Sequence, residues 1–271
     1  MKYNFQKIQY RFKKIKYDFC GGSDMKETEI TIFEKLQKEL KMLADKNKLG
    51  ERQLDITCSV LSPQEAIGDQ EREDFPIQKG KEKMVQACFG CSYGQAFTDM
   101  PNTFSGKIND LTGMTLKTNY ERAVFVSGLN AVLRELKMTD RTVHCKDEGP
   151  KKCSLELAEM VEKEYGNPQI ALFGLQPAMA EVLSQKFTMR IFDLDNDNIG
   201  KNKFGTVVEN GFCDMNDVEA WADLFLVTGS TLCNGTIVNF FNIKKPVVYF
   251  GITVAGAASL LNLKRFCPQS Q

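Results

Sequence analysis

One short polar stretch, residues 228–236 with the sequence TGSTLCNGT, carries hydroxyls, an amide and two glycines directly after an apolar run. The run, residues 223–227, has the composition of a parallel strand covered on both faces. Gly229 permits a sharp turn, and Ser230 and Thr231 stand where a helix N-cap is favoured. A strand, a polar loop and a helix in this order direct polar groups to the carboxyl end of the strand, where open α/β sheets bind ligands. An ordinary turn has the same composition, but we predict ligand contacts from Thr228, Gly229, Ser230, Thr231, Asn234, Gly235 and Thr236.

A second signal joins Gly174 to Asp193, 19 residues later. Each follows a short predicted strand. In nucleotide-binding folds an acidic residue about 20 positions after the first glycine loop accepts the ribose hydroxyls. This loop has one glycine where the dinucleotide fingerprint has three, so the spacing also fits a strand that merely ends in aspartate. Gln176, in the same loop, joins Gly174 and Asp193 as a candidate ligand contact.

Acid–base chemistry would fall to carboxylates, because the usual nucleophile motifs are absent. The sequence has no Gly-x-Ser-x-Gly, Walker or His-Glu-x-x-His pattern. His144 is the only histidine and lies in a charged stretch. The candidate acids and bases are therefore Asp99, Asp193 and Asp195.

An amide lies inside an apolar segment, residues 123–132, of a helix predicted from Thr118 to about Lys137. The segment is apolar on every side, so the helix should be buried, between two layers. A buried amide needs partners. Asn130 is therefore expected either to face a ligand or to cap a neighbouring loop.

The pair Cys88 and Cys91 has the spacing of two zinc ligands. We predict a single strand over residues 84–93, in which residues three apart point to opposite faces, so the two thiols could share a metal only across a bulge at Gly90. A second ligand pair at standard spacing is missing. A transient soft-metal site stays open, and its nearest further donors are His144, Cys145 and Cys153.

Hydrophobic periodicity divides the chain into two parts. The first part is α+β, and the second alternates helices and strands, which implies a parallel sheet with right-handed crossovers. The predicted helices of the first part cover residues 32–49 and 106–111, and its strands cover 53–61, 84–93 and 95–98, with a loop at 62–82. In the second part the predicted helices are 118–137, 154–165, 177–186, 237–241 and 252–261, and the strands are 170–173, 189–192, 223–227 and 247–250.

Crossovers of ordinary length bring the ends of the parallel strands to one edge of the sheet. Thr253, in the turn after the fourth strand, should join the candidates there. The first part should close over this edge, and Asp99 and Ser105 are its expected contributors. We predict domains at residues 25–114 and 115–271.

Residues 1–24 differ from the rest of the chain. They have neither a helical stripe nor a clean strand pattern, and Gly21-Gly22 shortly before Met25 is what a translated ribosome-binding site would give. We therefore expect residues 1–24 to be a non-native or disordered extension.

Composition excludes several classes of protein. The chain has 271 residues, with 35 Lys and Arg against 35 Asp and Glu, so no global field attracts nucleic acid or an anionic membrane. Nine cysteines without a regular framework indicate reduced thiols and a cytoplasmic protein. No apolar run is long enough for a membrane helix. A homo-oligomer stays open.

Four segments resemble the family of uncharacterised proteins described as "putative heavy-metal chelation". They are residues 227–236 (VTGSTLCNGT), 251–256 (GITVAG), 128–131 (GLNA) and 171–174 (ALFG). The resemblance covers most of the chain after about residue 28. It implies an α/β fold in which an enolase-N-terminal-like α+β domain precedes a Rossmann-like domain, with a site between the two.

The resemblance also implies a function. It suggests an enzyme that condenses or hydrolyses a pterin-, flavin- or siderophore-like metabolite, with a metal ion or metal chelate as a cofactor or ligand. The alternative is a non-catalytic binding protein for a metal chelate or a nucleoside-type ligand. An enzyme should place a carboxylate with a raised pKa beside the loop hydroxyls, whereas a binding protein needs only shape and satisfied hydrogen bonds.

Overall fold

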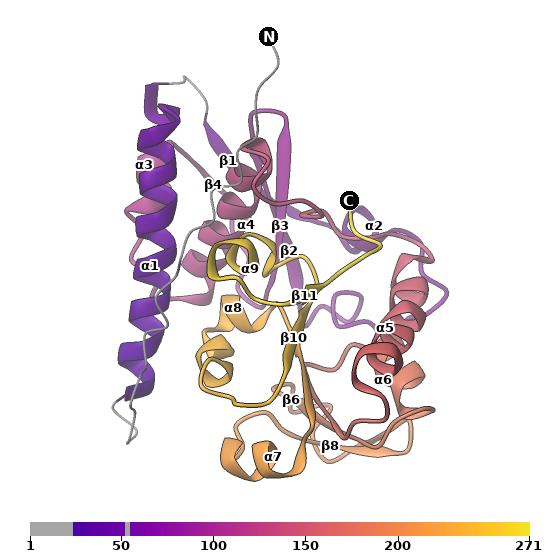
Figure 1. Cartoon of the computed structure of the whole chain (residues 1–271). Coiled ribbons are helices and arrows are strands. Elements are labelled where there is room, and N and C mark those ends of the chain that lie inside the picture. The colour runs from indigo at the N-terminus through magenta and orange to yellow at the C-terminus, as the bar shows by residue number, and fades with distance from the viewer. Residues whose placement is uncertain (1–23, 52–54) are drawn as a thin grey trace.

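The computed structural model describes residues 24–51 and 55–271. It contains an antiparallel sheet built from the first part of the chain and a mostly parallel sheet built from the second (Figure 1). The predicted α/β class is confirmed. The domain boundaries and the Rossmann-like and enolase-N-terminal-like names remain predictions, and the proposed extension lies outside the described residues except for Asp24.

The first sheet has the order β3-β2-β1-β4, and all its neighbouring strands are antiparallel. The long helix α1 runs along one side of the molecule (Figure 1) and packs against α3 and α9. The elements of this part are α1 (Asp24–Lys46), a 3-10 turn (Leu49–Glu51), β1 (Ile56–Leu61), α2 (Pro63–Ile67), β2 (Lys83–Phe89), β3 (Ser92–Thr98), β4 (Phe104–Gly106) and α3 (Ile108–Thr112).

The second sheet has the order β11-β10-β9-β5-β6-β8-β7, and its pairs are parallel except β7 with β8. Its strands are β5 (Ile170–Phe173), β6 (Met189–Asp193), β7 (Asn202–Lys203), β8 (Thr206–Asn210), β9 (Leu224–Thr228), β10 (Val247–Phe250) and β11 (Arg265–Phe266). The helices are α4 (Asn119–Glu135), α5 (Gly149–Tyr165), α6 (Pro177–Ser184), α7 (Met215–Trp221), α8 (Thr231–Asn234) and α9 (Ala255–Leu261), and a 3-10 helix covers Thr236–Phe240.

The strand order of this sheet reverses between β5 and β9. The chain runs from β5 to β6 and β8 on one side, and then returns to place β9, β10 and β11 on the other. Ligands of open α/β sheets bind at such a reversal, in the crevice beyond the carboxyl ends of the strands. The topology therefore marks the ends of β5 and β9.

Helix α4 ties the two sheets together. It packs against β2 and β3 and also against α8 and α9, and residues 122–133 within it are buried. One hydrophobic cluster includes side chains from α1, the first sheet, α4 and one face of the second sheet. On that face Phe173 stacks against Phe192 at 4.5 Å and against Phe225 at 6.1 Å between ring centroids. The alternate residues of β5, β6 and β9 pack on the other face, with α5 and α6.

The structure corrects three predicted elements. The strand predicted over residues 84–93 is a hairpin that turns at Gly90, where φ is +62°. The loop predicted at 62–82 contains α2, which begins in a capping box between Ser62 and Glu65. The helix predicted at 237–241 is replaced by α8 and a 3-10 helix, because Gly235 adopts the left-handed conformation between them.

None of the helices in the described ranges has the length and apolar character needed to cross a membrane.

Candidate functional site

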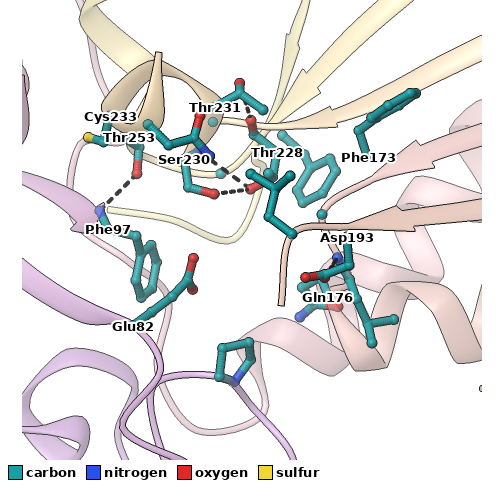
Figure 2. Close-up of a pocket in the computed structure, with 18 of the residues that line it drawn as sticks. Glu82, Phe97, Phe173, Gln176, Asp193, Thr228, Ser230, Thr231, Cys233 and Thr253 are labelled. Carbon is teal, nitrogen blue, oxygen red and sulfur yellow. Dashed lines mark hydrogen bonds between the residues drawn. The ribbon is translucent and has the colours of Figure 1, made fainter. Parts of the chain in front are cut away.

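A cavity of about 620 Å³ lies where the two sheets meet. Its walls come from the carboxyl ends of β5, β6, β9 and β10 and from the facing ends of β2 and β3 (Figure 2). Most of the site residues predicted from the sequence line it. These are Asp99, Gly174, Gln176, Asp193, Thr228, Gly229, Ser230, Thr231, Asn234, Thr236 and Thr253.

Three predicted site residues do not line the cavity. Gly235 is buried in the turn after α8. Ser105 lies in β4 opposite Thr57, with its side chain exposed on a different part of the first sheet. Asn130 is fully buried behind the cavity wall.

The Asn130 side chain acts as a clamp between the two sheets. Its Nδ2 donates to the carbonyl oxygens of Gln95 (3.0 Å), Ile252 (3.2 Å) and Thr253 (3.2 Å). Its Oδ1 accepts from the Gly256 backbone N–H at 2.7 Å. Asn130 therefore fixes the turn that presents Thr253, and its amide has its partners within the protein.

Two glycines allow the strand ends to approach closely. Gly174 has φ of +89°, and a Cβ there would lie 2.4 Å from Thr228 Cγ2 and 2.9 Å from Thr228 Cβ. A Cβ on Gly229 would lie 2.9 Å from the Val254 backbone nitrogen. The Gly229 N–H donates to the Phe250 carbonyl oxygen at 2.8 Å. Side chains at these positions would push apart the backbone segments that form the cavity floor.

The polar loop after β9 is held by its own hydrogen bonds. Thr231 Oγ1 donates to the Thr228 carbonyl oxygen at 2.7 Å, and the Thr228 and Ser230 hydroxyls lie 3.1 Å apart. Asn234 Oδ1 accepts from the Thr236 N–H (3.0 Å) and hydroxyl (2.7 Å). Ser230 precedes α8 but caps no N–H with its side chain. Because α8 is a single turn, the helix expected to orient this loop contributes little, and the loop orients itself.

Asp193 lies at the end of β6 with its carboxylate fixed by backbone donors. Asp193 Oδ2 accepts from the Leu175 N–H and Oδ1 accepts from the Asp195 N–H, both at 2.7 Å. Burial nevertheless raises the pKa of this carboxyl, and the Asp195 charge adds to the effect. The side chain is half-buried at the cavity wall.

Glu82 faces Asp193 from the other side of the cavity. In Figure 2 its carboxylate points from the first sheet into the space between Phe97, Ser230 and Asp193. Burial raises its pKa to about 7, with further contributions from the charges of Asp193 and Asp99. Within the described ranges, no lysine or arginine forms an ion pair with Glu82.

The lysine next to Glu82 in the sequence that lines the cavity, Lys81, is paired with other carboxylates. Lys81 forms ion pairs with Asp195 (3.6 Å) and Asp197 (2.5 Å). Glu82 therefore changes between its neutral and charged forms near neutral pH, inside a cavity whose other charged groups are mainly carboxylates.

A further wall of the cavity contains His144 and three cysteines, Cys145, Cys153 and Cys267. Burial lowers the pKa of His144 to about 4. The neutral ring lies with Nδ1 2.5 Å from the Cys145 carbonyl oxygen, which makes Nδ1 the protonated nitrogen. Burial also raises the pKa of Cys145 to about 12 and raises that of Cys153. These thiols are therefore protonated at neutral pH.

The side chains of the described residues do not form a site for a resident metal ion. Within residues 24–51 and 55–271, no three His, Cys, Asp or Glu side chains are arranged to hold one. Cys88 and Cys91 flank the hairpin turn, and the Cys88 thiol donates to the Gly90 carbonyl oxygen at 3.8 Å. The two thiols are not separated by a regular strand, contrary to our prediction, because β2 ends at Phe89.

Three notable lining residues were not predicted from the sequence, Glu82, Phe97 and Phe212, and His144 was named only as a possible metal donor. Glu82 stands between two lysines in a polar stretch and resembles a solvated charge. Phe97 and Phe212 carry no local signal for a site. Only the meeting of the two sheets brings these side chains to one cavity.

Comparisons with known proteins agree with the resemblance seen in the sequence. Residues 156–262 match the DUF364 family, described as "Putative heavy-metal chelation". Those residues run from α5 to the C-cap of α9 and include the carboxyl edge of the second sheet. No curated protein matches the chain significantly.

Two solved structures are similar to the chain. One is a DUF364 protein of unknown function from Pyrococcus horikoshii, with 15% identity, a TM-score of 0.49, and coverage of 82% of this chain and 79% of that one. The other is a DUF364 protein of unknown function from Desulfitobacterium hafniense, with 10% identity, a TM-score of 0.44, and coverage of 66% and 71%.

Proposed function

We propose that this protein is an enzyme that hydrolyses or condenses a small heterocyclic or metal-chelating metabolite in the cavity between the two sheets. The observation that carries the proposal is Glu82, a carboxyl with a pKa of about 7 that faces the polar loop after β9. General acid–base catalysis is most effective when the pKa of the catalytic group lies near the working pH. A protein that only binds its ligand has no need of such a group.

Glu82 would move a proton in either direction of the reaction. In hydrolysis its carboxylate accepts a proton from the attacking water, and the resulting acid returns it to the leaving group. In condensation the same steps run in reverse. The negative charges of Asp193 and Asp99 disfavour the charged form of Glu82 and so help to raise its pKa.

Other cavity residues would orient the substrate. The Ser230 and Thr228 hydroxyls and the Asn234 amide offer hydrogen bonds along one wall. Gln176 uses Oε1 to accept from the Met179 N–H at 2.5 Å, which leaves Nε2 to donate to a ligand. These groups fix orientation, and the apolar remainder of the cavity excludes water from the reacting atoms.

A metal would reach this cavity with the ligand. The described donors do not form a metal site of their own, so no step of the proposed reaction passes through a resident ion. The carboxylates of Glu82, Asp99 and Asp193 favour a ligand that carries positive charge, such as a cationic chelate. The same excess of carboxylates supports a second candidate function, in which the protein sequesters a metal chelate without catalysis.

The isosteric substitution Glu82→Gln separates the two functions. Native mass spectrometry of the purified protein first identifies the co-purified ligand, and a panel of pterins, flavins and catechol chelators serves if none is retained. We expect Glu82→Gln to lower turnover about 10²- to 10⁴-fold while it changes ligand affinity far less. The control is Glu71→Gln, an exposed carboxylate paired with Lys151 outside the cavity. Equal turnover in Glu82→Gln and the wild type would exclude Glu82 as the acid–base group.

A further inference from the structure

The most exposed large apolar side chain of the described residues lies at the mouth of the cavity. Phe212 is 73% exposed and lines the cavity just beyond β8. Leu194, 37% exposed, lines it beside Phe212. Exposed apolar side chains at the rim of a pocket are typical of a ligand-binding surface. We call Phe212 and Leu194 the apolar lip.

The backbone beneath the apolar lip is fixed. The Gly211 N–H donates to the Asp193 carbonyl oxygen at 2.8 Å, and the Phe212 N–H donates to Asn210 Oδ1 at 2.9 Å. A Cβ on Gly211 would lie 3.2 Å from the Asp193 carbonyl oxygen, so this turn packs closely on the end of β6. The turn therefore holds the Phe212 backbone in place and leaves the aromatic ring exposed to pack on a flat ligand ring.

A carboxylate suited to a pair of hydroxyls is next to the apolar lip. Asp193 in β6 lies opposite Asn210 in β8, and Asn210 precedes Phe212 by two residues. Each Asp193 oxygen accepts one backbone hydrogen bond, which leaves further lone pairs for hydroxyl donors. An acidic residue at this position of a parallel sheet can bind the two hydroxyls of a ribose.

The remaining groups lie in a row along the same edge. The neighbouring strands β9, β5, β6 and β8 deliver Thr228, Gly174, Asp193 and Phe212 in that order. Three strand spacings cover about 14 Å. A planar base on Phe212, a sugar at Asp193 and a substituent near Thr228 would fill this row.

Charge restricts the substituent. Glu82, Asp99 and Asp193 line the cavity, and its only lysine or arginine among the described residues, Lys81, is paired with Asp195 and Asp197. A phosphate would meet these carboxylates without a free cation. A neutral or cationic substituent would not.

We propose that the cavity takes a ribonucleoside without phosphate, whose base packs on Phe212 and Leu194 and whose hydroxyls bind Asp193. This assignment rests on the proposed function, because it names the ligand class of the same cavity. Its test is an equilibrium measurement, so it can fail while the role of Glu82 in turnover stands.

The experiment is isothermal titration of the full chain with adenosine, 2′-deoxyadenosine and adenosine monophosphate. We expect adenosine to bind, the deoxy compound to bind about tenfold more weakly for want of one hydroxyl, and the monophosphate to bind more weakly than adenosine. Guanosine and uridine extend the panel, since stacking tolerates different bases.

Substitutions of Phe212 test whether the base of the nucleoside packs on the apolar lip. Phe212→Ala should weaken adenosine binding about 10-fold or more, and Phe212→Leu should weaken it less. Val207→Ala is the control, because Val207 is an exposed apolar residue of β8 that does not line the cavity. Unchanged melting of each variant shows that folding is intact.

Two results would overturn the proposal. One is wild-type protein that binds none of the three ribonucleosides adenosine, guanosine and uridine. The other is equal adenosine affinity in Phe212→Ala and the wild type. If either occurs while Glu82→Gln still lowers turnover of the co-purified ligand, only the ligand class is wrong.

Discussion

Glu82 couples the chemistry of the cavity to the stability of the fold. Its pKa rises from 4.5 to about 7 on folding. The folded state therefore holds the proton more tightly than the unfolded state. This stabilisation is fully present below about pH 4.5 and is lost as the pH rises through about 7.

We expect the free energy of unfolding to fall by on the order of 1–3 kcal/mol across this pH window because of Glu82 alone. Glu82→Gln removes the titrating group, so the variant should gain stability relative to the wild type as the pH rises. Urea denaturation at several pH values between about 5 and 8 measures the difference. Parallel pH profiles for the two proteins would contradict the assigned pKa.

Asn130 and Glu82 show which properties of single residues can be predicted from the sequence and which cannot. An amide inside an apolar helix indicated that Asn130 must find partners, and the sequence left a ligand and a neighbouring loop as alternatives. The structure supplies the loop, through Ile252, Thr253 and Gly256. Glu82 could not be identified in this way, because its burial depends on a sheet that comes much later in the chain.

At the scale of elements, the close approach of β5 and β9 depends on Gly174. Gly205, in the turn between β7 and β8, provides a control: both glycines have positive φ, +89° and +85°, but a Cβ on Gly205 would meet no atom within 4 Å. An alanine at either position would adopt a positive φ that side chains rarely take, which costs on the order of 1 kcal/mol. Only at Gly174 would it also collide with Thr228.

We expect Gly174→Ala to lower the free energy of unfolding by about 2–4 kcal/mol, and Gly205→Ala by about 1 kcal/mol. Rotation of the Thr228 side chain cannot relieve the collision, because Thr228 Cβ, 2.9 Å away, is fixed to the backbone. Denaturant unfolding of both variants gives the comparison. Similar losses at the two positions would show that the strand ends yield more easily than this packing indicates.

The parallel strands were the most predictable elements. Their apolar runs at residues 170–173, 189–192 and 247–250 needed only local pattern, and each matches a strand of the structure. The hairpin of β2 and β3 was predicted as one strand followed by a short second one, because Gly90 and Gly94 compete as turns and local pattern favours neither. Strands β7 and β8 lie in a stretch of Asn, Lys and Gly, and β8 forms because β6 offers it an edge to pair with.

At the scale of the whole molecule, the two sheets share one hydrophobic cluster through α4. We therefore expect calorimetric unfolding to show a single transition with equal calorimetric and van't Hoff enthalpies. A fragment of residues 115–271 would expose the face of α4 that packs on β2 and β3. It should lack near-UV circular dichroism and bind hydrophobic dyes.

If the fragment behaves in this way, the predicted boundary between residues 114 and 115 marks a change of topology. The part that follows it would not fold stably on its own. The fragment supplies the decisive comparison, with the full chain as its control. A cooperative melt of the isolated fragment would show instead that the second sheet folds alone.

The clamp formed by Asn130, together with the hydrogen bond from the Phe97 N–H to Thr253 Oγ1 (3.1 Å), has a consequence for the rate of ligand exchange. Release by parting of the two sheets would require the common core to open, which in single domains usually occurs at or below about 10 per second and often far more slowly. Enzymes commonly turn over at about 1 to 1,000 per second. Ligand exchange at the faster of these rates therefore cannot depend on parting of the sheets. The exposed side of the cavity beside Phe212 offers a route, because rotation of exposed side chains takes picoseconds to nanoseconds.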